Sequence, residues 1–115
     1  MRRPGGSQAG GARMARMSAI VHVVLVEWQD GADPAEADAL VDRHLVPLPG
    51  VLTLDRGPSV STEGLESGFD WALVIRFASA DALAAYLPHP EHVVVGSFLQ
   101  AHAARLVVFD VAAAR

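Results

Sequence analysis

Among the side chains of this 115-residue chain that could take part in proton transfer at neutral pH, five histidines and a single tyrosine stand out. Their densest group is the segment His89-Pro90-Glu91-His92, and Tyr86 lies three residues before it. An imidazole with a pKa near ~6.5 can accept a proton at neutral pH, and a tyrosine hydroxyl can donate a hydrogen bond to a developing oxyanion. A Tyr/His pair over an apolar cavity could therefore remove an acidic C–H proton and hold the resulting enolate.

His22 is a further candidate, because it interrupts an apolar run and lies among Ile20, Val24 and Val26. If this side chain points to the sheet face that meets a second copy of the chain, we expect it to line the same cavity. A buried histidine bonded to a backbone carbonyl is the structural alternative for His22.

The other histidines also have interpretations that need no catalysis. His89 lies between two prolines and could simply cap the helix that follows, while His44 and His102 fall on apolar helical faces at the core or its rim. A zinc or iron site is a further alternative, because His89-x-x-His92 supplies two ligands at helical spacing. The chain has no cysteine, so His22, Glu91 or Asp70 would have to complete such a site. No nucleotide or redox-cofactor motif is present, and we expect no cofactor.

The elements that must position these residues are four strands and two helical regions. Apolar, β-branched runs predict strands over residues 20–28, 51–56, 69–77 and 106–111. Asp33-Pro34 predicts a helix start, and Pro47, Pro49 and Gly50 predict the end of that helix. Ser79 can cap a short helix that runs to Tyr86 and Leu87, and a second helix is expected over 90–103. The order β-α-β-β-α-β predicts an α+β ferredoxin-like fold with a four-stranded antiparallel sheet.

The sheet is expected to be apolar on both faces. The first and last strands are apolar on either alternating face, whereas the uncovered face of a lone ferredoxin-like domain should be polar. Large apolar patches are rarely left exposed on a monomer. We therefore expect a two-fold homodimer formed through this sheet face.

Composition limits the domain organisation and the partners. Residues 1–18 hold four arginines, four glycines and no acid, and we expect a disordered basic tail with a possible true start at Met17. Residues 19–111 form the domain and residues 112–115 a short tail. From residue 19 onward there are five arginines and 13 acidic residues, a net charge of −8, which argues against nucleic-acid binding. No apolar run approaches the roughly 20 residues of a membrane span, and we expect a cytoplasmic protein.

Four segments in order resemble the stress-responsive A/B barrel (Dabb) domain family. They are 21–25 with Trp28, 57–61 followed by 68–70, Tyr86-Leu87-Pro88-His89-Pro90-Glu91-His92, and 107–110. The resemblance covers roughly residues 19–111. It implies a dimeric α/β barrel whose members include plant stress-induced proteins, many bacterial proteins and olivetolic acid cyclase.

The resemblance also implies a site. By similarity to the cyclase, which closes a polyketide ring by aldol condensation without a cofactor, Tyr86 would be the oxyanion partner and His92 the general base. His22 and His89 would be pocket or supporting residues. Phe69, where the family often has tyrosine, and Trp71 on the same face of the third strand would complete the pocket. The expected function is a homodimer that binds a small hydrophobic metabolite. The alternatives are a cofactor-free cyclase or lyase and a cofactor-free monooxygenase or haem-binding relative.

Overall fold

The structure, a computed structural model, describes residues 18–113. The tail expected before residue 18 and the possible start at Met17 lie outside the described residues. Within them, four strands form one antiparallel sheet in the order β2-β3-β1-β4, which confirms the predicted α+β ferredoxin-like fold. The elements in chain order are β1 (Ile20–Trp28), α2 (Pro34–His44), β2 (Val51–Pro58), β3 (Trp71–Phe77), α3 (Ala80–Tyr86), α4 (Pro90–His102) and β4 (Ala103–Ala112).

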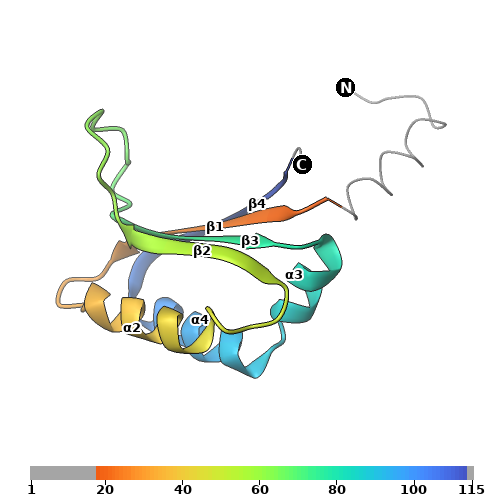
Figure 1. The fold of residues 1–115 in the computed structure, drawn as a ribbon. Helices are drawn as coiled ribbons and strands as arrows, with labels where there is room; N and C mark the ends of the chain where they lie inside the picture. The colour runs from red at the N-terminus through yellow and green to blue at the C-terminus, as the bar shows by residue number, and fades with distance from the viewer. Residues whose placement is uncertain (1–17, 114–115) are drawn as a thin grey trace.

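All three helices lie on one side of the sheet (Figure 1). The two central strands supply most of the core, because every second residue of β1 and β3 points toward the helices. The helices add Ala37 and Val41 from α2, and Val95 and Leu99 from α4. The largest fully buried side chains are Trp71, Phe77, Leu45, Leu73, Ile75, Val26, Val41 and Val95.

The predicted helix starts are confirmed by their caps. The Asp33 carboxylate accepts a hydrogen bond from the Ala35 N–H at 3.0 Å, and the Ser79 hydroxyl accepts one from the Ala82 N–H at 3.1 Å. The strand limits differ by a few residues from those predicted. β3 begins at Trp71 and not at Phe69, because the Phe69 N–H bonds to the Glu66 carbonyl in a turn.

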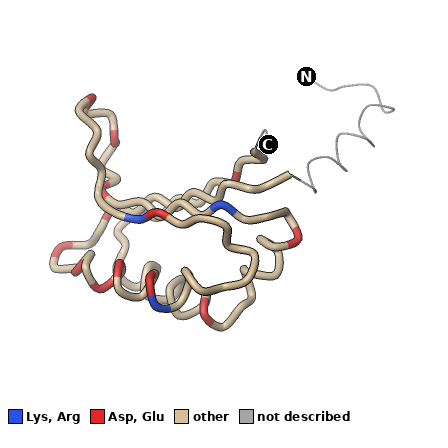
Figure 2. The backbone as a smooth tube through the Cα atoms, viewed as in Figure 1, with Lys and Arg blue, Asp and Glu red and all other residues tan. Residues whose placement is uncertain are grey.

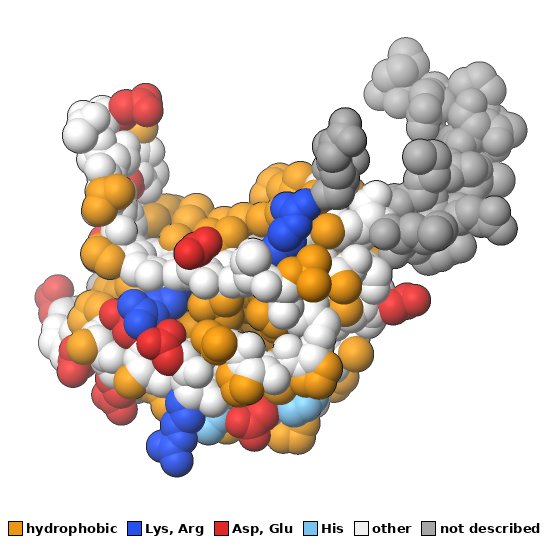
Figure 3. Space-filling view, viewed as in Figure 1, with side chains coloured by type: hydrophobic (Ala, Val, Ile, Leu, Met, Phe, Trp, Pro, Cys, Tyr) orange, Lys and Arg blue, Asp and Glu red, His pale blue; other side chains and the backbone are white. Residues whose placement is uncertain are grey.

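The face of the sheet turned away from the helices, called here the open face, is apolar as predicted. Val107, Phe109 and Val111 of the edge strand β4 are 40%, 63% and 43% exposed there. Through the cross-strand register they continue Leu25, Val23 and Val21 of β1. Figure 2 shows that most charged residues lie on the helices and loops, and Figure 3 shows apolar side chains along the upper side of the sheet.

A long loop between β2 and β3, residues 59–70 and called here the arm, rises on the side of the open face (Figure 1). Arg105 of β4 holds its second half: the guanidinium lies 4.2 Å from the centre of the Phe69 ring, bonds to the Ser67 carbonyl and pairs with Glu27 at 2.6 Å. Several contacts therefore hold the arm in place. Among the described residues, no helix is both long and apolar enough to cross a membrane.

Candidate functional site

Tyr86 ends α3, and aromatic rings surround it. Its ring centroid is 4.3 Å from that of His92, 4.7 Å from that of Phe77 and 5.8 Å from that of His22. His22 comes from the third position of β1 and His92 from the first turn of α4. The fold thus brings together three of the side chains that the sequence singled out.

These three side chains line one cavity of about 180 Å³ between α4 and the helix-covered face of the sheet. The cavity is otherwise mostly aliphatic, so its polar groups can orient a ligand while its walls exclude water. His22 lines the cavity from the helix-covered face. From the sequence we expect His22 in the cavity only if it faces a second copy of the chain. That condition was wrong, because His22 points toward the helices together with Ile20, Val24 and Val26. Aliphatic lining residues include Val24, Leu73, Val95, Leu99, Leu106 and Val108.

Burial controls the protonation of Tyr86. The residue is only 4% exposed, and loss of hydration raises the pKa of its hydroxyl well above the ordinary value of about 10. The phenol is therefore protonated at neutral pH and can donate a hydrogen bond into the cavity.

The hydrogen bond made by His92 assigns its ring nitrogens. Nδ1 lies 2.7 Å from the carbonyl oxygen of Leu87. A carbonyl only accepts, so Nδ1 must carry the proton, and in the neutral ring Nε2 keeps a free lone pair. That Nε2 lies beside Gly96, where a Cβ would come within 3.7 Å of it, and Gly96 lines the cavity. His92 therefore presents a proton acceptor at the cavity wall.

His22 is oriented in the same way by a residue that the sequence did not single out. Its Nδ1 lies 2.5 Å from Oδ1 of Asp110, and the two residues face each other in the β1–β4 register. The sequence carries no local signal for Asp110, because β1 also contains Glu27 and β4 also contains Arg105. Only the strand register shows that Asp110 faces His22.

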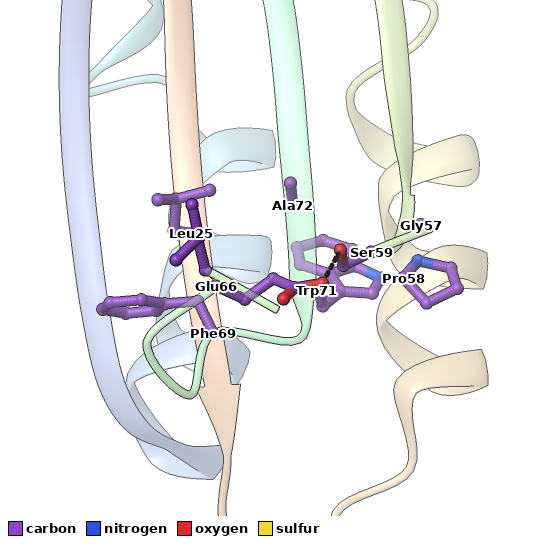
Figure 4. A pocket seen from close by; sticks show the side chains of 9 residues that line it. Leu25, Gly57, Pro58, Ser59, Glu66, Phe69, Trp71 and Ala72 are labelled. Atoms are coloured by element: carbon purple, nitrogen blue, oxygen red, sulfur yellow. Dashed lines mark hydrogen bonds between the residues drawn. The ribbon is translucent and has the colours of Figure 1, made fainter. Parts of the chain in front are cut away.

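Three other predicted residues lie apart from this cluster. His89 is the N-cap of α4, and its Nδ1 accepts a hydrogen bond from the Glu91 N–H at 3.1 Å, as the capping alternative predicted. Phe69 and Trp71 line a second hollow of about 300 Å³ at the foot of the arm (Figure 4). Trp71 is tied to α2 there, because its Nε1 donates to Asp38 at 2.9 Å. Both residues lie near the start of β3, whereas Phe77 is at its other end, close to Tyr86. The prediction that Phe69 and Trp71 share one pocket with Tyr86 and His92 was therefore wrong.

The remaining histidines stabilise helices. His44 pairs with Glu91 at 2.6 Å and so joins α2 to α4, and His102 bonds to the Phe98 carbonyl at 2.9 Å within α4. In the part of the chain that the structure describes, no three histidine, aspartate or glutamate side chains cluster as a metal site requires.

Comparisons with known proteins agree with this fold. The family model described as the stress responsive A/B barrel domain matches residues 20–113. A stress-response A/B barrel domain-containing protein, HS1 of Arabidopsis thaliana, is 29% identical over 94 residues, which are 79% of this chain and 86% of that protein.

Solved structures are similar over the same region. A dimeric ferredoxin-like protein of unknown function from Jannaschia sp. CCS1 is 26% identical, with a TM-score of 0.72 over 83% of this chain and 99% of that one. Hydroxynitrile lyase from Passiflora edulis is 14% identical, with a TM-score of 0.76 over 84% of this chain and 94% of that one, a likeness of fold alone. From the match over residues 20–113, the chain belongs to the stress-responsive A/B barrel domain family.

Proposed function

We propose that this chain acts as a homodimer that binds a small, mainly apolar molecule in the cavity beneath Tyr86. The observation that carries the proposal is the cavity itself, in which a protonated phenol and two oriented imidazoles interrupt an aliphatic wall. An apolar cavity of about 150 Å³ is known to hold benzene. The cavity of about 180 Å³ therefore suits a single ring with a small polar substituent.

The dimer is supported by the open face and by a relative. Phe109 and its apolar neighbours on β4 are exposed, and the similar protein from Jannaschia is described as dimeric. A second copy packed on the open face would bury this surface and leave the cavity, which lies on the other side of the sheet, available to ligand. The cytoplasmic location stays a prediction from the sequence.

The binding test compares two probe molecules that differ by one hydroxyl. In an NMR titration, p-cresol should shift the ring signals of Tyr86, His22 and His92, and toluene should bind more weakly because it leaves these polar groups unpaired. The exposed α4 residue Val93 is a reference signal that should not move. Binding of neither probe at the cavity would reject the proposal.

Cofactor-free acid–base catalysis is the second candidate, and the fixed tautomer of His92 favours it. In an aldol-type step, His92 Nε2 would take the proton from a carbon next to a carbonyl, while the C–H electrons form the enolate. Tyr86 would donate its hydrogen bond to the enolate oxygen. The enolate carbon would then attack a second carbonyl, and His92 would return the proton to the alkoxide that forms. Proton, electrons and carbon atoms balance without any co-reactant.

Proton exchange on a simple ketone tests this chemistry. Acetophenone in D₂O should exchange its methyl hydrogens faster with the protein than with buffer, and His92→Ala should remove the acceleration while the dimer persists in sedimentation. Loss of the dimer in His92→Ala would favour a structural role for that residue. Exchange no faster than in buffer would reject the catalytic candidate.

A further inference from the structure

His22 is the one histidine, acidic or basic side chain that is buried among the described residues, at 3% exposure. Burying an imidazole is unfavourable unless its nitrogens find partners. Asp110 provides one, since its Oδ1 lies 2.5 Å from His22 Nδ1, and the Asp110 side chain is 42% exposed. A single contact thus joins a side chain at the cavity wall to a carboxylate in contact with solvent.

We infer that Asp110 is a positioning residue that makes Nε2 of His22 a second hydrogen-bond acceptor of the cavity. The inference rests on the proposed function, because it assigns a role within the same site. An ionised carboxylate only accepts hydrogen bonds, so Nδ1 of His22 carries the proton and the lone pair of the neutral ring is on Nε2. The ring edges packed against Phe77 and Tyr86, at 5.9 Å and 5.8 Å between centroids, hold this orientation.

The two histidines of the cavity differ in the partner behind them. His92 donates to the uncharged carbonyl of Leu87, whereas His22 donates to a carboxylate. A carboxylate that accepts from Nδ1 fixes the ring and makes its other nitrogen a stronger hydrogen-bond acceptor, as the aspartate behind the histidine of a serine-protease triad orients that ring. Nε2 of His22 is therefore suited to accept from a ligand O–H group, and the ligand class it favours is a phenol or an enol.

The Asp110 carboxylate is partly in contact with solvent. Asp110 stands on the edge strand β4, and water can solvate its exposed oxygen while the other oxygen contacts His22. The ligand hydroxyl then donates a hydrogen bond to Nε2 of His22, and its oxygen can accept one from the protonated hydroxyl of Tyr86. None of the described residues that line the cavity is acidic, so no carboxylate in the wall competes for the ligand hydroxyl.

Two readouts test the inference, the tautomer of His22 from imidazole ¹⁵N shifts and the affinity for p-cresol. The full chain should show His22 as the Nδ1–H tautomer. In Asp110→Ala the Nε2–H tautomer of His22 should also be populated, because nothing then accepts from Nδ1. p-Cresol binding should weaken about tenfold, the size expected for a hydrogen bond to a charged group. Asp110→Asn should keep the tautomer, because the amide oxygen still accepts from Nδ1. Asp55→Ala removes an exposed carboxylate from the other edge strand, β2, and should change neither readout.

The outcomes separate this inference from the proposed function. An Nε2–H tautomer in the full chain, or an unchanged tautomer in Asp110→Ala, would overturn the role of Asp110. If Tyr86→Phe weakens p-cresol binding while Asp110→Ala does not, ligand binding stands and the inference fails. If p-cresol does not bind at all, the proposed function fails and the tautomer readout alone decides whether Asp110 positions His22. Thermal unfolding of each variant shows that the fold is retained, as expected for a partly exposed edge residue.

Discussion

Tyr86 is the only side chain of this sequence whose ordinary pKa lies between about 9 and about 12, because the chain has one tyrosine, no lysine and no cysteine. Burial raises the pKa of this hydroxyl above its value in the unfolded chain. The stabilisation is then complete below the unfolded pKa of about 10 and is lost as pH rises toward the folded pKa. We predict that the free energy of unfolding starts to fall near about pH 10, the unfolded pKa, and keeps falling as pH rises further.

Urea unfolding at several pH values measures this effect, and Tyr86→Phe is the matched variant. Phenylalanine keeps the ring that packs on Phe77 and His92, and its free energy of unfolding should stay level over the same alkaline range. An equal alkaline loss in both proteins would mean that another group titrates, and the raised pKa of Tyr86 would be wrong.

At the residue scale the sequence singled out three side chains that the fold brings together, Tyr86, His92 and His22. Pro88 and Pro90 interrupt the helical spacing in Y-x-x-H-P-x-H, so the sequence left the geometry of this segment open. Asp110 was missed because its role depends on the register of two strands that are 88 residues apart. Phe69 and Trp71 share a strand face in the pattern, yet the end of the strand at which they lie is set by tertiary packing.

At the element scale, the start of α4 distinguishes capping from a role in the cavity. His89 accepts a hydrogen bond from the Glu91 N–H, so His89→Ala should lower the free energy of unfolding by about 1 kcal/mol. His89→Ser keeps a capping oxygen and should recover most of that stability. Both variants should bind p-cresol as the unmodified chain does at a temperature where they are folded. Weaker p-cresol binding by His89→Ser would mean that His89 contributes to the binding site.

Two glycines of the arm give a second prediction. Gly64 and Gly68 both have positive φ, at 72° and 92°, so alanine is strained at either position, by roughly 1 kcal/mol. A Cβ at Gly64 meets open space, whereas one at Gly68 would lie 2.6 Å from the Arg105 guanidinium and 3.1 Å from the Glu27 carboxylate. Gly68→Ala should therefore cost more stability than Gly64→Ala in chemical denaturation. Equal losses would mean that Arg105 does not hold the arm.

The elements themselves were largely predictable, and the arm was not. Alternating apolar residues, Asp33, Ser79 and the prolines are local signals, and local hydrogen bonds fix the strands and helix starts that they predict. The sequence indicated a polar loop over 59–68. Its upright position depends on Arg105, which is 38 residues from Ser67 and 78 from Glu27, and no local pattern records such contacts.

At the scale of the whole molecule, the apolar residues of the sheet lie in two places, the core and the open face. Apolar residues of β1 and β3 fill the core under the helices, and on the open face β4 alone exposes Val107, Phe109 and Val111. The 51% hydrophobic composition exceeds what one covered face needs, and the surplus was visible in the sequence. The partner's orientation was not, because a two-fold contact depends on the shape of the open face and the arm.

The dimer can be tested with one residue of the open face. Phe109 is 63% exposed on that face, and burying such a side chain contributes about 1.5–3 kcal/mol in each copy. Phe109→Asp removes this contribution twice and places two unpaired charges in the interface, which costs several kcal/mol more. We predict a dimer for the unmodified chain and a folded monomer for Phe109→Asp in sedimentation at micromolar concentration. The control is Val93→Asp, because Val93 is 50% exposed on the outer side of α4, and this variant should remain dimeric. A monomer in all three proteins would show that the open face stays uncovered, and a dimer in all three would place the interface elsewhere.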